Sequence, residues 1–135
     1  MLKSLFSRNI NIPTLRLSGV IGQAGLTKSG LNINSLDKLI EKLFMDKKCK
    51  AVALIVNSPG GSPTQSSLIA EKIIKKSKEK NKKIITFVED IAASGGYWLA
   101  CAGDEIYINI NSIVGSIGVI SPGFGFVDLL KKIGV

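Results

Sequence analysis

The sequence contains no histidine among its 135 residues. A Ser-His-Asp triad, a Cys-His pair and the ordinary histidine sites for zinc are therefore excluded within this chain. A serine nucleophile here would need a different general base. A lysine is the plausible alternative, because desolvation lowers the pKa of a buried amine and keeps it neutral.

Cysteine is almost as scarce, since the chain carries two, Cys49 and Cys101. Two cysteines make neither a disulfide framework nor a metal cluster. Cys101 lies among apolar residues, so we expect a buried thiol at that position. The sequence therefore implies no cofactor and no metal site.

Long uninterrupted apolar segments are also lacking. The uncharged stretch 106–127 is broken by asparagine, serine, glycine and proline, which makes it too polar to span a membrane. The first eleven residues have no apolar core of the signal-peptide kind. We expect neither a transmembrane segment nor a signal peptide in this chain.

Positive charge, by contrast, is abundant, with a net charge of +8. Such an excess suggests nucleic acid or an anionic membrane as a partner. The largest group of lysines, however, lies in residues 72–83, at the carboxyl end of an expected helix, where the helix dipole favours cations. No aromatic residues are interleaved for base stacking. We therefore expect a solvated helix end and no nucleic-acid partner.

Strand-length and helix-period patterns alternate along the chain, which predicts an α/β fold with a mainly parallel sheet and right-handed crossovers. Residues 1–13 are expected to be a lead-in and 14–135 a single domain. Strands are predicted at 15–21, 51–56, 84–88, 105–109 and 116–121. Helices are predicted around 36–44, from Pro63 onward, at 97–102 and at 126–133. The apolar stripes facing the core are expected to be Leu36, Leu39, Ile40, Leu43 and Phe44 in the first helix and Ile69, Ile73 and Ile74 in the second.

Two glycine turns follow buried strands in this pattern, Gly60-Gly61 and Ser94-Gly95-Gly96. Both lie at carboxyl ends of parallel strands, where active sites of such sheets gather. Beyond the first turn, Ser62, Pro63 and Gln65 have the spacing of a capping box at a helix start. We expect the two turns to converge in space.

Ser94 is placed where a strand turns into a helix, so its hydroxyl would point out of the end of the sheet. The N–H of Gly95 could stabilise an oxyanion, and the Gly60-Gly61 turn could supply a second donor. The alternative is that Ser94 is merely an N-cap and the glycines a structural turn. For three other serines a structural role is expected: Ser58, Ser62 and Ser116.

Three motifs in order resemble the protease IV, or signal peptide peptidase A, family: Asn57-Ser58-Pro59-Gly60-Gly61, Ala93-Ser94-Gly95-Gly96-Tyr97 and Gly115-Ser116-Ile117-Gly118-Val119. The resemblance covers about 15–135. It implies a crotonase-like (Clp-protease-like) spiral of β-α-β units and a serine endopeptidase of the Ser–Lys dyad type that degrades cleaved signal peptides or other short or unfolded peptides. By motif match, Ser94 would be the nucleophile, Gly61 and Gly95 the oxyanion hole, and Gly60 and Gly96 the supporting turn.

The resemblance also implies what this chain lacks. The family's general-base lysine lies about fifty residues after the serine, beyond Val135, whereas Lys131 and Lys132 are expected to be solvated helix-end charges. We therefore expect an incomplete catalytic domain with little activity alone. The implied partners are peptide substrates, copies of the same chain in a homo-oligomer, and a membrane contacted peripherally. The implied location is bacterial, either cytoplasmic or at the inner membrane.

Two other functions stay open from the sequence. A crotonase-type acyl-CoA enzyme would share the oxyanion arrangement, and a membrane-associated scaffold would carry the serine as a vestige. Three aromatic residues could line a substrate groove or belong to the core: Tyr97, Trp98 and Phe124.

Overall fold

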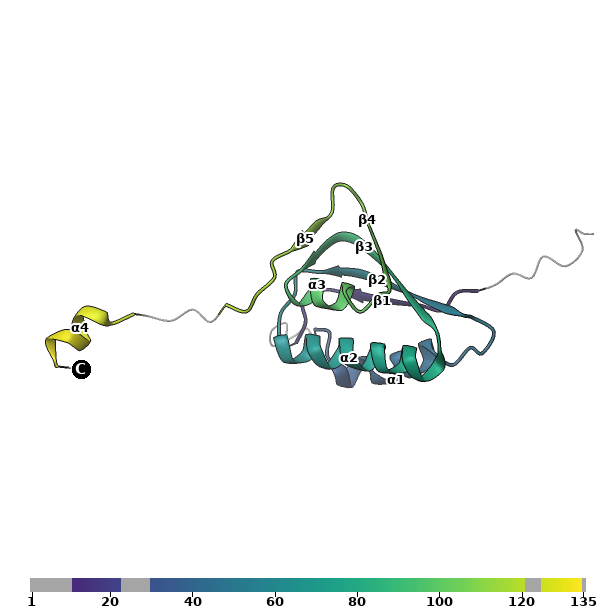
Figure 1. The fold of residues 1–135 in the computed structure, drawn as a ribbon, viewed down its shortest axis with the longest axis horizontal. Helices are drawn as coiled ribbons and strands as arrows, with labels where there is room; N and C mark the ends of the chain where they lie inside the picture. The colour runs from purple at the N-terminus through teal and green to yellow at the C-terminus, as the bar shows by residue number, and fades with distance from the viewer. Residues whose placement is uncertain (1–10, 23–29, 121–124, 135) are drawn as a thin grey trace, which may run out of the picture.

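The computed structural model describes residues 11–22, 30–120 and 125–134, and it shows strands and helices in alternation (Figure 1). The strands are β1 (Thr14–Ser18), β2 (Ala51–Ser58), β3 (Lys83–Ala93), β4 (Glu105–Ile108) and β5 (Ile113–Gly115). The helices are α1 (Ile33–Leu43), α2 (Pro63–Lys80), α3 (Gly95–Ala100) and α4 (Val127–Lys132).

The five strands form one sheet in which every pairing is parallel. The order is β1-β2-β3-β4, and β5 pairs with the last part of β3, beyond the end of β4. The predicted α/β architecture with a mainly parallel sheet is confirmed, and it is consistent with a Clp-protease-like fold. Parallel pairing brings the carboxyl ends of β2 and β3 to the same edge of the sheet.

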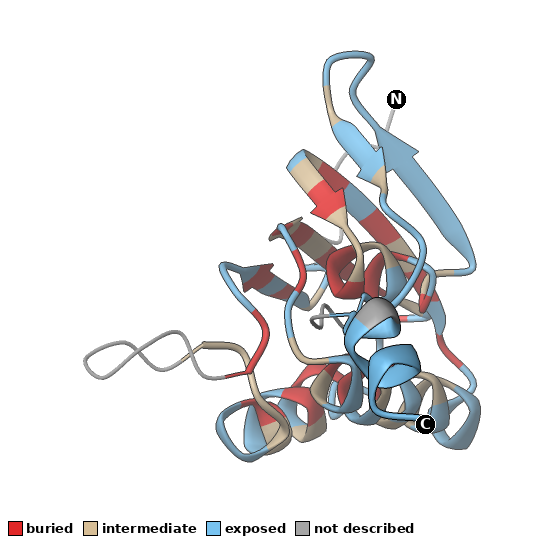
Figure 2. Ribbon diagram, turned by 90° about the vertical axis from the view of Figure 1, so that its left-hand side faces the viewer, coloured by how far each residue is buried: buried red, intermediate tan, exposed pale blue. Residues whose placement is uncertain are grey.

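The core lies between the sheet and helices α1, α2 and α3, which pack on the same face. Residues of β1 alternate in burial because successive side chains point to opposite faces, whereas the central strand β2 has no exposed residue. On the other face, Phe87 of β3 is 43% exposed and stacks on Tyr107 of β4, with ring centroids 5.4 Å apart. Figure 2 shows β4 and most of β5 as exposed, so the covered part of the sheet is β1 to β3.

One predicted strand is wrong. Residues 116–120 form no strand, and the short strand β5 lies just before them. The physical reason is backbone conformation: Ser116 has φ of 53° and Gly118 has φ of 153°, which the extended strand conformation does not allow. The predicted position 121 lies outside the described residues.

The predicted core stripes are largely confirmed. Leu36, Ile40 and Leu43 are buried on α1, and Ile69 and Ile73 on α2. Leu39 is an exception, because it is 50% exposed at the solvent edge of the apolar stripe. The remaining two predicted stripe residues are Phe44, which is buried, and Ile74, which is partly buried.

The lysines of α2 are less solvated than the sequence suggests. Lys72 pairs with Asp37 and, at 3.3 Å, with Glu41 of α1. Lys76 pairs with the same Glu41 at 3.1 Å. These ion pairs join α1 to α2, so part of the lysine cluster has a structural role. The expectation of a solvated helix end holds for the exposed lysines alone.

Helix α4 is drawn apart from the sheet (Figure 1), and Lys131 and Lys132 are exposed on it. Within the described ranges, no helix is both long enough and apolar enough to cross a membrane.

Candidate active site

Ser94 occupies the single residue between the end of β3 and the start of α3. Its backbone has φ of 52° and ψ of −119°, a conformation that costs a residue with a side chain about 1–3 kcal/mol. The Ser94 N–H donates to the carbonyl of Gly115 at 2.8 Å, which helps to hold this conformation. Serine hydrolases of other folds expose their nucleophile on a strained strand-to-helix turn of the same kind.

The alternative in which Ser94 merely caps α3 finds no support in the geometry. Ser94 stands at the N-cap position, but its side chain makes no capping hydrogen bond. Ser94 instead lines a cavity and is partly exposed. A strained residue whose side chain caps nothing points to function rather than to helix stability.

The two glycine turns meet, as the sequence predicts. A methyl group added at Gly60 would lie 2.7 Å from the carbonyl oxygen of Ala93, 2.8 Å from the nitrogen of Gly95 and 2.9 Å from the Cβ of Ser94. Gly60 also has φ of 98°. Glycine is required here for both reasons, because any side chain would strain the backbone and push the two turns apart.

The other three predicted glycines lie in the same cluster. A side chain at Gly95 would collide with the hydroxyl of Ser66, and one at Gly96 with the carbonyl of Ser58. Gly61 lies against Ile21, whose backbone bonds to both neighbours of Gly61. The Ile21 N–H donates to the carbonyl of Gly60 at 2.8 Å, and the Ile21 carbonyl accepts from the N–H of Ser62. The structure thus brings together Ser94, Gly60, Gly61, Gly95 and Gly96.

Two backbone donors in this cluster are unused. The N–H groups of Gly61 and Gly95 have no acceptor among the described residues. Gly95 is the first residue of α3, where backbone N–H groups have no partner within the helix. An anion arriving at the cavity would meet these donors without displacing an existing hydrogen bond.

A cavity of about 370 Å³ opens at Ser94. Tyr97 and Trp98 line it, as the groove interpretation of these residues predicts, while Phe124 lies outside the described residues. The remaining lining residues are Gly61, Pro63, Gly95, Cys101, Ile117, Gly118 and Val119. The wall is mainly apolar and includes no lysine among the described residues, so the cavity suits an apolar side chain better than a charged one.

The expectation of a buried thiol at Cys101 is wrong. Cys101 is exposed and lines the cavity, because it follows the last turn of α3, whose buried side is occupied by Leu99 and Ala100. A hydrogen bond with the Cys101 side chain raises the pKa of Tyr97, and the electrostatic interaction between the two side chains adds to this effect. Cys49 is the buried cysteine, and desolvation raises its pKa above the ordinary value.

The predicted capping box at α2 is half formed. The Ser62 hydroxyl accepts from the N–H of Gln65 at 3.4 Å, and Pro63 is the first helical residue. The reciprocal bond is absent, because the Ser62 N–H donates to Ile21 at 2.8 Å instead. The side chain of Gln65 accepts from the N–H of Ile33 at 2.8 Å and so holds the start of α1 against α2.

Ser58 supports the Gly60 turn, in line with the structural role expected for it. Its hydroxyl donates to the carbonyl of Gly19 at 2.6 Å and accepts from the N–H of Gly60 at 3.2 Å. Ser58 is fully buried, and its bond with the N–H of Gly60 lies away from water. Ser66, which packs against Gly95 and donates to the carbonyl of Ser62 at 2.9 Å, was not singled out from the sequence.

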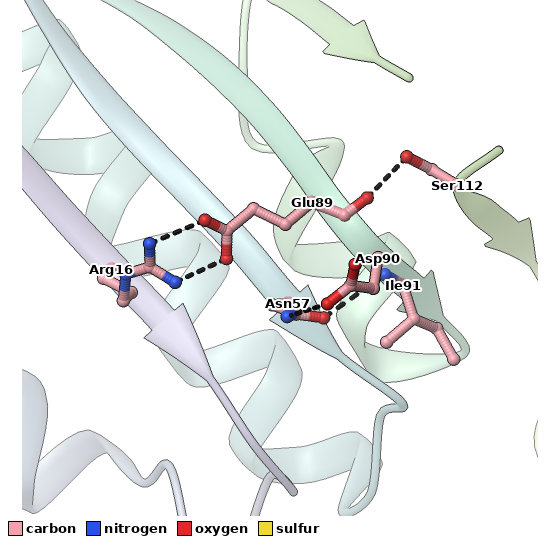
Figure 3. Close-up of polar contacts among 6 residues, drawn as sticks. All are labelled: Arg16, Asn57, Glu89, Asp90, Ile91 and Ser112. Carbon is pink, nitrogen blue, oxygen red and sulfur yellow. Dashed lines mark hydrogen bonds and ion pairs between the residues drawn. The ribbon is translucent and has the colours of Figure 1, made fainter. Parts of the chain in front are cut away.

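Asn57 compensates for an irregularity in β3 (Figure 3). The pairing of β2 with β3 shifts register between Val56 and Ser58, which leaves β3 bulged before Ala92. The Asn57 side chain accepts from the N–H of Ile91 at 3.3 Å and donates to Asp90 at 2.9 Å. Asn57 thereby holds the bulge that carries the chain toward Ser94.

A second set of polar contacts joins the strands upstream (Figure 3). Arg16 of β1 reaches across β2 and forms a two-bond ion pair with Glu89 of β3, one bond of which measures 2.6 Å. The hydroxyl of Ser112 donates to the carbonyl of Glu89. Arg16 and Glu89 are 73 residues apart, and nothing in the sequence pattern links them.

Among the described residues, no cluster of three or more histidine, cysteine, aspartate or glutamate residues could hold a metal ion. The groups that the cavity does bring together are Ser94 and the backbone of Gly61 and Gly95.

Comparison with known proteins relates this chain to a peptidase family and to proteins of different names. The sequence model of peptidase family S49 matches residues 76–135. Protease 4 of Haemophilus influenzae is 33% identical over 92% of this chain, and a chloroplastic serine protease SPPA of Arabidopsis thaliana is 33% identical over 90% of it. A protein named Na(+)/H(+) antiporter NhaA from Brucella melitensis is 50% identical over the whole chain. The chain spans about a fifth of the length of each: 20%, 20% and 19% respectively.

Proposed function

We propose that this chain, which belongs to peptidase family S49, carries the nucleophile of a serine peptidase and that Ser94 is that nucleophile. The observation that supports this most is the strained Ser94, which faces an apolar cavity beside two unused backbone N–H groups. Acyl transfer needs a nucleophile and oxyanion donors in this relation.

In the proposed reaction, the Ser94 oxygen attacks the carbonyl carbon of a peptide bond. Negative charge develops on the carbonyl oxygen, and the N–H groups of Gly61 and Gly95 stabilise it. Removal of one such donor typically costs about a hundred- to thousand-fold in turnover. Collapse of the tetrahedral intermediate breaks the C–N bond and leaves an acyl group on Ser94, which water then hydrolyses.

A base must take the Ser94 proton and pass it to the leaving amine. The chain has no histidine, and no described residue that lines the cavity is a lysine. We propose a Ser–Lys dyad whose neutral lysine lies beyond Val135. On this proposal residues 14–135 are part of a catalytic domain, and the 135-residue chain alone hydrolyses peptides poorly.

The substrate is proposed from the cavity wall. Trp98, Ile117 and Val119 offer apolar surface next to Ser94, which suits apolar side chains of short or unfolded peptides such as cleaved signal peptides. A homo-oligomer, peripheral contact with a membrane and a bacterial cytoplasmic or inner-membrane location belong to the same proposal. These are supported by family membership alone.

The test is hydrolysis of a fluorogenic apolar peptide by the full-length product of the gene. Ser94→Ala should lower kcat by several orders of magnitude, since loss of a serine nucleophile costs roughly a million-fold in a well-studied case. Ser67→Ala, which removes a hydroxyl from an α2 side chain bonded to Glu71, is the control and should keep its activity. Full activity in Ser94→Ala would overturn the proposal, and binding of acyl-CoA with peptides left intact would favour an acyl-CoA enzyme.

A further inference from the structure

Six lysines line two adjacent hollows at the end of the molecule where β2 and β3 begin. The hollows measure about 190 and 500 Å³ and share Lys50, Asn81 and Lys82. We name this surface the lysine basin, and its lysines are Lys47, Lys50, Lys78, Lys80, Lys82 and Lys83. We propose that the lysine basin binds phosphate-bearing anions.

The lysines come from three segments that the fold brings together: the loop after α1, the end of α2 and the start of β3. A helix dipole accounts for cations at the end of α2. It does not account for Lys50 before β2 or for Lys83 in β3. The N–H of Lys83 donates to the carbonyl of Lys50 at 3.0 Å, so the two strands fix these lysines side by side.

The centre of the basin is held rigidly. Lys82 is 7% exposed, which is unusual for lysine, and its ammonium group donates to the backbone carbonyl of Asp46. The backbone N–H of Lys82 donates to the carbonyl of Ser77 at 3.0 Å, and the Ser77 hydroxyl donates to the carbonyl of Lys82 at 2.6 Å. The basin is therefore formed before any ligand arrives.

The positive charge of the basin is only partly neutralised. Among the described residues, Asp104 is the single carboxylate that lines the hollows, and it already accepts from the N–H of Ile84 at 2.7 Å. The carboxylate of Asp46 interacts with Lys82 and accepts from the N–H of Lys48 at 2.8 Å. Lys83 pairs with Glu105 at a long 3.5 Å. Four basin lysines have no ion-pair partner among the described residues: Lys47, Lys50, Lys78 and Lys80. Like charges held close together destabilise the fold, and a bound polyanion would remove that cost.

The chemistry of the basin favours phosphate over nucleic-acid bases. Ammonium groups act as point charges toward phosphate oxygens, and the described residues of the hollows include no exposed aromatic side chain on which a base could stack. Inorganic polyphosphates and anionic phospholipid headgroups both offer this chemistry. Because the basin lies at the amino ends of the strands, a ligand there leaves the Ser94 cavity at the carboxyl ends open, and the proposal is independent of peptidase activity.

The experiment compares two triple variants that lose the same charge. The basin variant K47Q/K50Q/K80Q removes exposed basin lysines and spares buried Lys82. The control variant K38Q/K131Q/K132Q removes exposed lysines of α1 and α4. Circular dichroism first shows that both variants are folded, and then the dissociation constant for inorganic triphosphate is measured by calorimetry at fixed ionic strength. The second arm measures sedimentation with vesicles of phosphatidylcholine with and without phosphatidylglycerol.

Triphosphate should bind the wild-type chain and the control and should bind the basin variant at least about tenfold more weakly. If the bound phosphate belongs to a lipid headgroup, partition of the basin variant onto anionic vesicles should be roughly a hundred-fold weaker than that of the wild type. The expected loss is about 1 kcal/mol for each lysine removed. Either result supports the proposal and identifies the source. Absence of binding in both arms, or equal losses in basin and control variants, would overturn it. An oligonucleotide that bound the basin when triphosphate and vesicles did not would also overturn it, in favour of a nucleic-acid site.

Discussion

Gly60 and Ser94 are 34 positions apart in the sequence and in direct contact in the fold, with only 2.9 Å between the Ser94 Cβ and the place where a Gly60 side chain would begin. This contact joins the turn after β2 to the turn after β3. It places Ser94 and two residues with unused N–H groups, Gly61 and Gly95, along the wall of one cavity. The candidate chemistry depends on this junction, so the first prediction tests it.

Gly60→Ala should destabilise the chain more than Gly19→Ala does. The two glycines have nearly the same φ, 98° and 99°, so both substitutions strain the backbone by about 1 kcal/mol or more. A methyl group at Gly19 meets nothing within 4 Å, whereas one at Gly60 collides with the Ser94 turn. Urea unfolding measures the free energy of unfolding of each variant. Equal losses would show that the two turns are not packed as described.

Ser58→Ala should lower the free energy of unfolding by about 1–3 kcal/mol, because it leaves the buried N–H of Gly60 without an acceptor. It should also weaken peptidase activity of the full-length protein by displacing the turn, with kcat more affected than KM. Ser67→Ala, whose hydroxyl is bonded to Glu71 on the helix surface, is the matched control. A Ser58→Ala protein as stable as the control would contradict the assigned role.

Acid should weaken the contact between α1 and α2. The hydrogen bond from Lys76, aided by Lys72, holds the pKa of Glu41 below its ordinary value. A lowered carboxyl pKa stabilises the fold above the unfolded-state pKa, and this contribution disappears as the pH falls through the folded-state pKa. Glu41→Gln should therefore be less stable than the wild type at neutral pH, and the difference should shrink on acidification below pH about 4.

The measurement for this prediction is urea unfolding of both proteins across the acid range. Glu71→Gln, on the exposed part of α2, is the control for the loss of one carboxylate outside the contact between α1 and α2. A stability difference between wild type and Glu41→Gln that stays constant with pH would contradict the assignment.

A thiol reagent should modify Cys101 quickly and Cys49 only on unfolding. Cys101 is exposed at the cavity wall, whereas Cys49 is buried, donates to the carbonyl of Asn11 at 2.8 Å and has a raised pKa. A bulky adduct on Cys101 should also block peptidase activity, because Cys101 and Ser94 line the same cavity. Mass spectrometry locates the adduct. Cys101→Ser should keep activity after the same treatment, and loss of activity in that variant would mean that the reagent acts elsewhere.

Much of the fold could be predicted from local patterns. The alternation of strands and helices, the start of α2 at Pro63 and the buried strand β2 all follow from residue type and spacing, which act over a few neighbours. The predicted strand at 116–121 failed because apolar β-branched residues suggest extended backbone, while the positive φ of Ser116 depends on its surroundings. The same limit explains Cys101, whose exposure depends on which side of α3 meets the sheet.

The sequence by itself determined the order of elements, the missing histidine base and the two glycine turns at strand ends. It also allowed their convergence to be inferred, because parallel strands bring their carboxyl ends to one edge. The tertiary structure alone decided that Asn57 holds the bulge before Ser94, that Arg16 joins Glu89 across a strand, and that lysines from three segments form a basin at the far end. The physical reason is that local propensity acts over a turn or two of chain, whereas these contacts depend on register and packing between segments that are distant in sequence.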